Sequence, residues 1–139
     1  MLPMSTDSPL YIEESHGYRV EVKTQFDFTR SNPLQGQFLF QYTVTIKNIR
    51  GVHAQLLTRT WHIQDAKGEV RQVKGPGVVG HTPHLKSGEA FEYASFCPLP
   101  TLTGKMWGHF EMLGVNGETF EITTPVFRFQ VPDDLIDRY

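Results

Sequence analysis

The chain has 139 residues, enough for one domain with a hydrophobic core that needs neither a disulfide nor a structural metal. Its formal net charge of −2 argues against a nucleic-acid partner, because such binding needs a basic face that displaces phosphate counterions. The single cysteine, Cys97, cannot form an internal disulfide, which suits a reducing compartment, so we expect a cytoplasmic protein. No stretch approaches the roughly 20 apolar residues that span a bilayer, so we expect no membrane partner.

Residues 1–17 show neither a strand pattern nor the charged start and apolar run of a signal peptide, and we predict a flexible N-terminal arm there. Residues 18–28 and 37–46 alternate apolar and polar side chains with period 2, which predicts strands with one buried face. No helix would gather the apolar side chains of the second segment on one side.

Five further strands follow. They are predicted over residues 55–65, 69–74, 90–96, 104–113 and 118–131. Leu57, Trp61 and Ile63 share one parity in the first of them, and Asn116-Gly117 is a strong hairpin signal before the last. The apolar parity of the last strand changes across Pro125, which indicates a bulge or a switch between sheets.

The absence of a helical period and the close spacing of turn residues favour an all-β fold. We predict an immunoglobulin or fibronectin type III-like two-sheet sandwich of about seven or eight strands over residues 18–131. Residues 132–139 are predicted to be a C-terminal tail that forms a turn of helix or stays loose.

A glycine-rich loop is the most suggestive motif. Gly75, Gly77 and Gly80 match G-x-G-x-x-G, but residues 80–88 show no helical period, so a Rossmann dinucleotide site is excluded. Two interpretations stay open: a tight connection between strands, or an anion-binding nest of backbone N–H groups helped by Lys74 and His81.

Arg59 is unusual because it shares the parity of the predicted core residues Trp61 and Ile63. Its stem then either covers Trp61 while its head reaches water, or its guanidinium is partly buried, where it fixes a loop or receives an anionic ligand.

Two aromatic residues, Phe96 and Trp107, lie off the core parity of their strands. They form an exposed patch for a protein partner or a second copy of the chain, or else the N-terminal arm covers them.

No catalytic constellation is visible. Cys97 has no spaced histidine partner, and the pair His81-x-x-His84 lacks the further ligands of a zinc site. We therefore expect that the protein is not an enzyme and that it has neither a metal site nor a cofactor.

The chain resembles the ApaG-domain family. The resemblance rests on the segments FQYTVTIKN (40–48), LLTRTWHIQDAKG (56–68), VKGPGVVG (73–80), SGEAFEY (87–93) and GKMWG (104–108). It implies a fibronectin type III-like sandwich with no established activity. The family is linked by genetic context to dinucleoside polyphosphate metabolism and to cobalt and magnesium tolerance. Related eukaryotic domains, in an F-box protein and a DNA polymerase delta-interacting protein, suggest protein recognition.

The resemblance also implies a pyrophosphate site at Gly75, Gly77 and Gly80. The chain departs from the family at two places, which weakens any role of the side chains there. Thr60 stands where an Arg-His-Trp run is common in the family, and residues 94–97 read ASFC where Thr-Ser-Gly is more usual.

The sequence thus leaves three hypotheses. The leading one is a non-catalytic binding module that recognises an unidentified protein partner. The second is phosphate, pyrophosphate or nucleotide binding through the glycine-rich loop with Lys74 and Arg59. The weakest is a divalent-cation sensor that uses His81 and His84.

Overall fold

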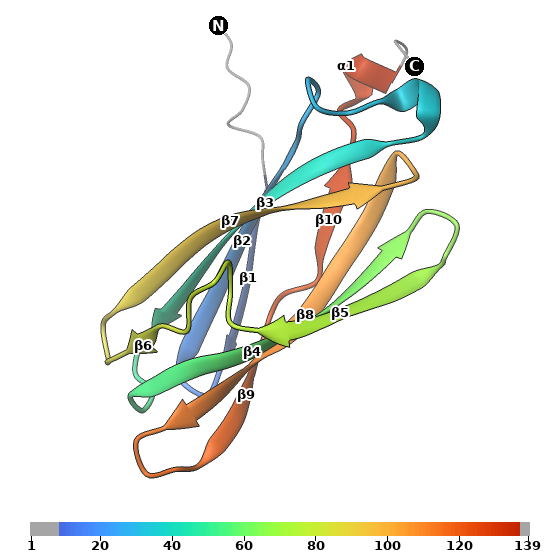
Figure 1. Cartoon of the computed structure of the whole chain (residues 1–139). Coiled ribbons are helices and arrows are strands. Elements are labelled where there is room, and N and C mark those ends of the chain that lie inside the picture. Colours follow the sequence, from blue (N-terminus) through green and yellow to red (C-terminus); the bar gives the residue numbers. More distant parts are fainter. Residues whose placement is uncertain (1–8, 137–139) are drawn as a thin grey trace, which may run out of the picture.

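A computed structural model describes residues 9–136, which form ten strands in two antiparallel sheets packed as a sandwich (Figure 1). The four-stranded sheet has the order β1(Leu10–Ser15), β2(Tyr18–Phe26), β3(Phe38–Asn48), β7(Ala90–Leu99). The six-stranded sheet has the path β10(Phe127–Gln130), β8(Thr103–Gly114), β4(Ala54–Asp65), β5(Val70–Pro76), with β6(His84–Leu85) paired to β4 and β9(Thr119–Thr123) paired to β8. Two short helices, η2(Pro33–Gln35) and α1(Asp133–Ile136), complete the fold. The predicted sandwich is confirmed.

Strand alternation builds the core between the sheets. Burial alternates without a break along β3, whose inward residues include Phe40 and Ile46, both fully buried. At the centre, the Trp61 ring meets those of Tyr42, Phe110 and Phe127 edge-on, with centroids 5.6–5.8 Å apart. Edge-to-face aromatic pairs of this kind add to the free energy of burial.

The N-terminal prediction is wrong for residues 10–17. β1 pairs with β2 along its whole length, from Leu10 opposite Lys23 to Ser15 opposite Tyr18. The connecting residues His16 and Gly17 both have positive φ, 53° and 79°, as a two-residue hairpin turn requires. In the rest of the predicted arm, Pro9 is exposed and belongs to no strand, and residues 1–8 lie outside the described residues.

The last predicted strand is two strands, β9 and β10, separated by residues 124–126. Both pair with β8, so the parity change marks a break within one sheet and not a switch between sheets. Thr124 fills the break: its backbone N–H donates to Gly108 (3.0 Å), and its hydroxyl accepts from the Gly108 N–H (2.8 Å).

The predicted core position of Leu57 is also wrong. The pairing of β4 with β8 shifts between Leu56 and Thr58, and Leu56 is the fully buried residue. A bulge places one extra residue in the strand and so changes which parity faces inward. Beyond it, Arg59 and Trp61 share the inward parity, and this orients the candidate site.

The tail contributes to the fold through α1, whose Leu135 and Ile136 pack against the core. The tail residues 137–139 lie outside the described residues. Between residues 9 and 136, no helix is both long and apolar enough to cross a membrane.

Candidate functional site

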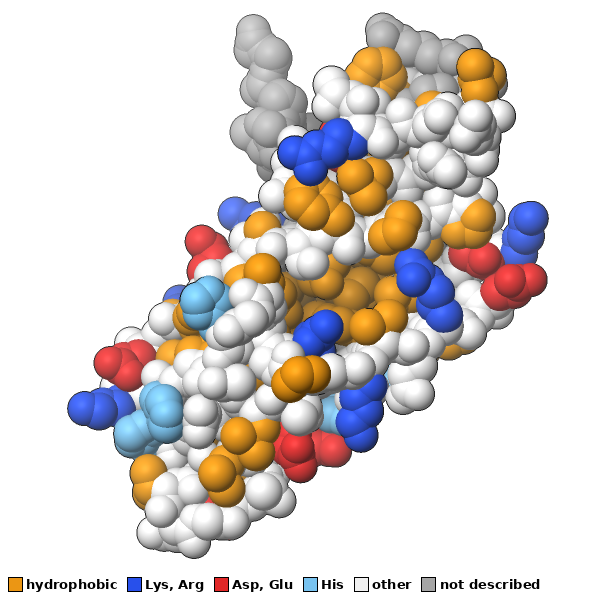
Figure 2. Space-filling model, in the orientation of Figure 1, with side chains coloured by type: hydrophobic (Ala, Val, Ile, Leu, Met, Phe, Trp, Pro, Cys, Tyr) orange, Lys and Arg blue, Asp and Glu red, His pale blue; other side chains and the backbone are white. Residues whose placement is uncertain are grey.

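A cleft of about 240 Å³ lies between the two sheets and is flanked by their edge strands β5 and β7. Figure 2 shows it as a hollow lined by hydrophobic side chains at the centre of one face, with basic side chains at the rim. The lining residues are Tyr42, Arg59, Trp61, Ile63, Arg71, Val73, Val79, Tyr93, Ser95, Phe96, Cys97, Pro98 and Met106. Two of them are arginines and none is acidic, so the cleft suits an anion.

Pairing between β4 and β5 determines which β5 side chains enter the cleft. Arg71 lies opposite Ile63, and Val73 lies opposite Trp61, so both project inward. The next inward position is Gly75, opposite Arg59. A Cβ atom there would approach Arg59 Nη1 to 3.1 Å, so the missing side chain gives the guanidinium its space.

Arg59 is held by the glycine-rich loop. Its Nη1 donates to the carbonyl oxygens of Pro76 (3.0 Å) and Gly77 (2.9 Å). The guanidinium therefore fixes the loop, which was one of the two roles that the sequence left open. Nη1 makes these two bonds, and Nε and Nη2 have no hydrogen bond within residues 9–136.

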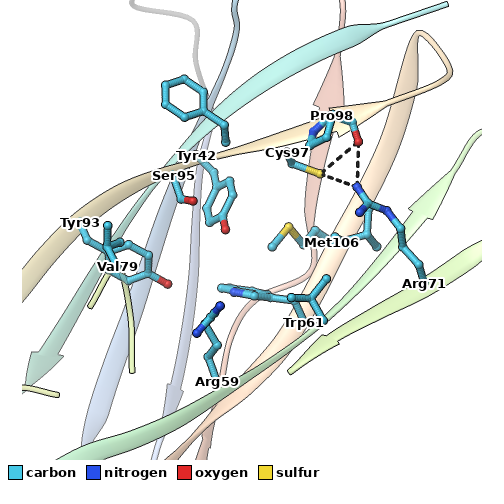
Figure 3. A pocket seen from close by; sticks show the side chains of 13 residues that line it. Tyr42, Arg59, Trp61, Arg71, Val79, Tyr93, Ser95, Cys97, Pro98 and Met106 are labelled. Carbon is cyan, nitrogen blue, oxygen red and sulfur yellow. Dashed lines mark hydrogen bonds between the residues drawn. The ribbon is translucent and has the colours of Figure 1, made fainter. Parts of the chain in front are cut away.

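Two deeply buried donors near Arg59 lack partners among the described residues. They are the indole N–H of Trp61 and the hydroxyl of Tyr93. The two residues are only 2% and 8% exposed, respectively. Figure 3 shows both pointing toward the space that the Arg59 guanidinium and the Tyr42 hydroxyl also face. A buried donor without a partner costs about 1–3 kcal/mol, so two of them on one side of one cleft need an explanation.

Burial keeps the two phenols neutral. Desolvation raises the pKa of Tyr93 well above its ordinary value, and the charge of Arg59 offsets only part of this. Burial likewise raises the pKa of Tyr42, against a smaller opposing effect of a hydrogen bond with Ser95. Both hydroxyls therefore keep their protons at neutral pH and are able to donate a hydrogen bond to an anion.

The opposite end of the cleft holds Arg71 and Cys97. Arg71 Nη2 donates to the Pro98 carbonyl (2.8 Å) and approaches Cys97 Sγ (3.8 Å), which links β5 to β7 (Figure 3). Desolvation raises the pKa of Cys97 to about 11 despite the neighbouring guanidinium. A thiol protonated at neutral pH is a poor nucleophile.

Of the predicted anion-site residues, Gly75 and Gly77 lie beside Arg59, but the loop around them offers few free donors. The N–H groups of Gly77 and Val78 already donate to Leu57 (2.8 Å) and His81 (2.8 Å), which leaves fewer donors for a nest. Gly77 is required by its φ of 62° and by the His81 carbonyl, 2.5 Å from where its Cβ would lie. Gly80 also has a positive φ, 82°, with open space around it.

Lys74 lies on the other face of β5. It pairs with Thr60, one position away from the inward pair of Arg59 and Gly75, so its side chain points away from the cleft. The structure thus separates Lys74 from Arg59.

Val79 occupies the rim of the cleft in a strained conformation. Its φ is 48°, in the left-handed region that β-branched residues rarely adopt, and its side chain is 58% exposed. Such strain costs about 1–3 kcal/mol and gathers at binding sites and ligand clamps.

The two predicted partner-binding residues lie on opposite faces of the sandwich and form no common patch. Phe96 pairs with Gln41 in the four-stranded sheet and has Arg30 over its ring at 4.9 Å. Trp107 lies on the outer face of the six-stranded sheet, where its ring stacks on His62 with centroids 5.5 Å apart.

The predicted histidine pair diverges. His81 packs against Phe91 and His84 against His53, with ring centroids 5.5 and 5.9 Å apart. No group of three or more His, Cys, Asp or Glu side chains in residues 9–136 is placed to hold a metal ion.

Sequence reasoning missed Tyr93, Arg71 and the indole N–H of Trp61 as parts of the cleft. Trp61 and Tyr93 read as ordinary core aromatics, and only the structure shows their polar atoms without partners. Arg71 shares the parity of Val73, and this was the one available signal that it faces inward.

Residues 28–114 match the model of the ApaG domain. The chain belongs to the ApaG-domain family. The ApaG protein of Anaeromyxobacter dehalogenans is 47% identical over 121 residues, which cover 87% of this chain and 95% of that protein. The ApaG protein of Mesorhizobium japonicum is 40% identical over 123 residues, 88% and 95% of the two chains. A crystal structure from Bordetella pertussis superposes with a TM-score of 0.79 at 39% identity and covers 91% of this chain and 98% of that one.

Proposed function

We propose that this ApaG domain is a non-catalytic binding module that takes up an anionic group in the cleft between β5 and β7. The observation that carries the proposal is the pair of buried, unpartnered donors, Trp61 Nε1–H and the Tyr93 hydroxyl, beside Arg59. A ligand that accepts hydrogen bonds would remove the free-energy cost of both donors at once.

Charge supports an anion over a neutral acceptor. Arg59 and Arg71 bring two positive charges into the lining, and no aspartate or glutamate among the lining residues balances them. A charge-assisted hydrogen bond is shorter and about twice as strong as a neutral one, so an anion gains more from this donor set than an amide or an alcohol.

The two tryptophans provide the test and its internal control. Trp61 lies in the cleft, whereas Trp107 lies on the outer sheet face. In ¹⁵N-labelled protein at constant ionic strength, a panel of phosphate, pyrophosphate, sulfate and carboxylates should include an anion that saturably shifts the Trp61 indole resonance and leaves that of Trp107 in place. If the Trp61 indole resonance does not shift with any of these anions, the proposal is refuted.

Recognition of a protein partner on the outer face is a second candidate. It is favoured by the stack of Trp107 on His62, with Lys105 Nζ 5.9 Å from the Trp107 ring centroid. Clustered aromatic and cationic side chains are typical of interface anchors. In affinity capture from native lysate, the parent and the Tyr93→Phe variant should both bind a protein that the Trp107→Ser variant does not bind. Capture of the same proteins by all three baits would count against this candidate.

A further inference from the structure

We propose that the anion is the carboxylate of a molecule with an apolar stem, and not a phosphate. This inference rests on the proposed function, because it names the ligand class of the same cleft. We call the end of the cleft that holds Arg59, Trp61 and Tyr93 the buried end.

The buried end holds one positive charge. Arg59 lies there with Trp61 and Tyr93, whereas Arg71 lies at the far end, beyond Trp61 and Met106 in Figure 3, and already donates to Pro98. A monoanion therefore neutralises the buried end one for one. A phosphate dianion would leave one negative charge without a cationic partner beside the buried Trp61 and Tyr93, which is unfavourable.

The remaining donors fit a planar acceptor. Arg59 binds the loop carbonyls of Pro76 and Gly77 through Nη1, so Nε and Nη2 remain for a ligand. A carboxylate has two oxygens, which accept from one guanidinium edge and keep lone pairs for the Trp61 N–H and the Tyr93 hydroxyl. A phosphate-binding nest, in contrast, is built from successive backbone N–H groups, and the loop has committed those of Gly77 and Val78.

Between Arg59 and Arg71, four aliphatic side chains contribute to the wall of the cleft. Ile63, Val73, Val79 and Met106 line it beside the aromatic rings. A fully hydrated inorganic anion gains nothing from such walls, whereas an aliphatic or aromatic stem is stabilised by about three- to fourfold in affinity per buried methylene group.

Hexanoate is the first probe, compared with acetate, hexan-1-ol, inorganic phosphate and pyrophosphate by titration of the Trp61 indole resonance. We expect hexanoate to bind most tightly, acetate at least about tenfold more weakly because it lacks four methylene groups, and hexan-1-ol more weakly than hexanoate because it has no charge. Tighter binding of phosphate or pyrophosphate than of hexanoate would overturn the carboxylate inference while the proposed function stands. No shift with any anion would remove both.

Conservative variants test the assignment of donors. Tyr93→Phe should weaken hexanoate binding by roughly 10- to 100-fold, the usual loss for one hydrogen bond to a charged group. Arg59→Lys should weaken it as well, because an ammonium cannot present two parallel donors. Tyr11→Phe on β1 is the matched control and should bind like the parent. Equal affinities for the parent and Tyr93→Phe would contradict the inference.

The carboxylate has two sources, a free small acid or the C-terminus of a protein, and a peptide arm separates them. A short uncharged peptide that ends in leucine is compared with its C-terminal amide. Tighter binding of the free peptide than of hexanoate assigns the site to a protein C-terminus, and the reverse assigns it to a small acid. Equal binding of the peptide and its amide would overturn the inference.

Discussion

The two sides of the sandwich join the same pair of sheets in different ways. At the first side, Thr24 Oγ1 donates to the Arg128 carbonyl (3.0 Å), and the Thr123 N–H donates to Ser15 Oγ (3.0 Å). Aromatic rings fill the space between them, as in the contact of Tyr11 with Phe127. We call this side, formed by β1 and β2 against β9 and β10, the closed side.

At the second side, the open side, β5 and β7 flank the cleft, and Arg71 reaches across to the Pro98 carbonyl. On the closed side the buried Tyr18 hydroxyl has partners, whereas the open side buries the Trp61 and Tyr93 donors without any among the described residues. A third buried atom without a partner, His53 Nε2, lies between β3 and β4 and belongs to neither side. Since unsatisfied buried donors destabilise a fold, the closed side contributes more to stability, and the open side has the features that the proposed ligand site requires.

The largest difference is expected from truncating an apolar residue on each side. Phe127 is fully buried and packs on Tyr11 and Trp61, so Phe127→Ala should lower the free energy of unfolding by about 3–5 kcal/mol. Val73 at the open side is 36% exposed, and Val73→Ala should cost less than about 1 kcal/mol. Urea unfolding measures both, and similar losses would contradict the comparison.

Alkaline pH should weaken the fold through the open side. Burial raises the pKa of Cys97 from its ordinary value of 9.0 to about 11, so the unfolded chain loses this proton before the folded protein does. The stabilisation is therefore fully present below pH 9 and is lost as the pH rises to 11, by up to about 3 kcal/mol.

Denaturant unfolding at pH 8, 9, 10 and 11 measures this loss, and Cys97→Ala is its control. The variant should keep its stability between pH 9 and 10, with a decline at higher pH from the buried tyrosines, whose pKa values are also raised. Parallel curves for the parent and the variant would show that the thiol does not contribute.

A matched pair of hydroxyl deletions sharpens the comparison. Tyr18 at the closed side donates to the Val52 carbonyl (2.6 Å) and accepts from Asn48 Nδ2 (3.1 Å). Tyr18→Phe should therefore cost about 1–2 kcal/mol, since it also leaves these partners unsatisfied. Tyr93→Phe removes a hydroxyl without a partner and should leave the free energy of unfolding unchanged or raise it by up to about 1 kcal/mol. A loss on Tyr93→Phe as large as that on Tyr18→Phe would remove the distinction between the sides.

The same contrast explains what the sequence predicts and what it does not. Alternation along β3 fixes which face is buried, because a side-chain period of 2 needs no knowledge of the neighbouring strands. It fails at Leu57, where a bulge that depends on the pairing with β8 changes the parity, and at β1, whose LYIEES segment alternates weakly and is ordered by β2.

The candidate site was predicted in part for a related reason. Arg59 is visible in the sequence as a charge on a core parity, and the glycine-rich loop as a motif, and the structure joins the two. Tyr93 is not visible, because a buried tyrosine with a hydrogen-bond partner and one without a partner have the same pattern. Only the position of its hydroxyl in the three-dimensional structure separates the two cases.

The smallest effect on stability is expected from breaking one cross-sheet hydrogen bond on each side. Arg71→Met keeps the apolar stem but removes the bond to Pro98, and Thr24→Val removes the bond to Arg128; each should change the free energy of unfolding by less than about 1 kcal/mol. Only Arg71→Met should speed the labelling of Cys97 by a thiol reagent at pH 8, by at least about twofold, because local opening exposes buried groups. The guanidinium lowers the pKa of Cys97, so its removal by itself leaves less thiolate and slows labelling. A faster reaction therefore reports access to the cleft, and an unchanged or slower rate would mean that Arg71 does not hold the open side together.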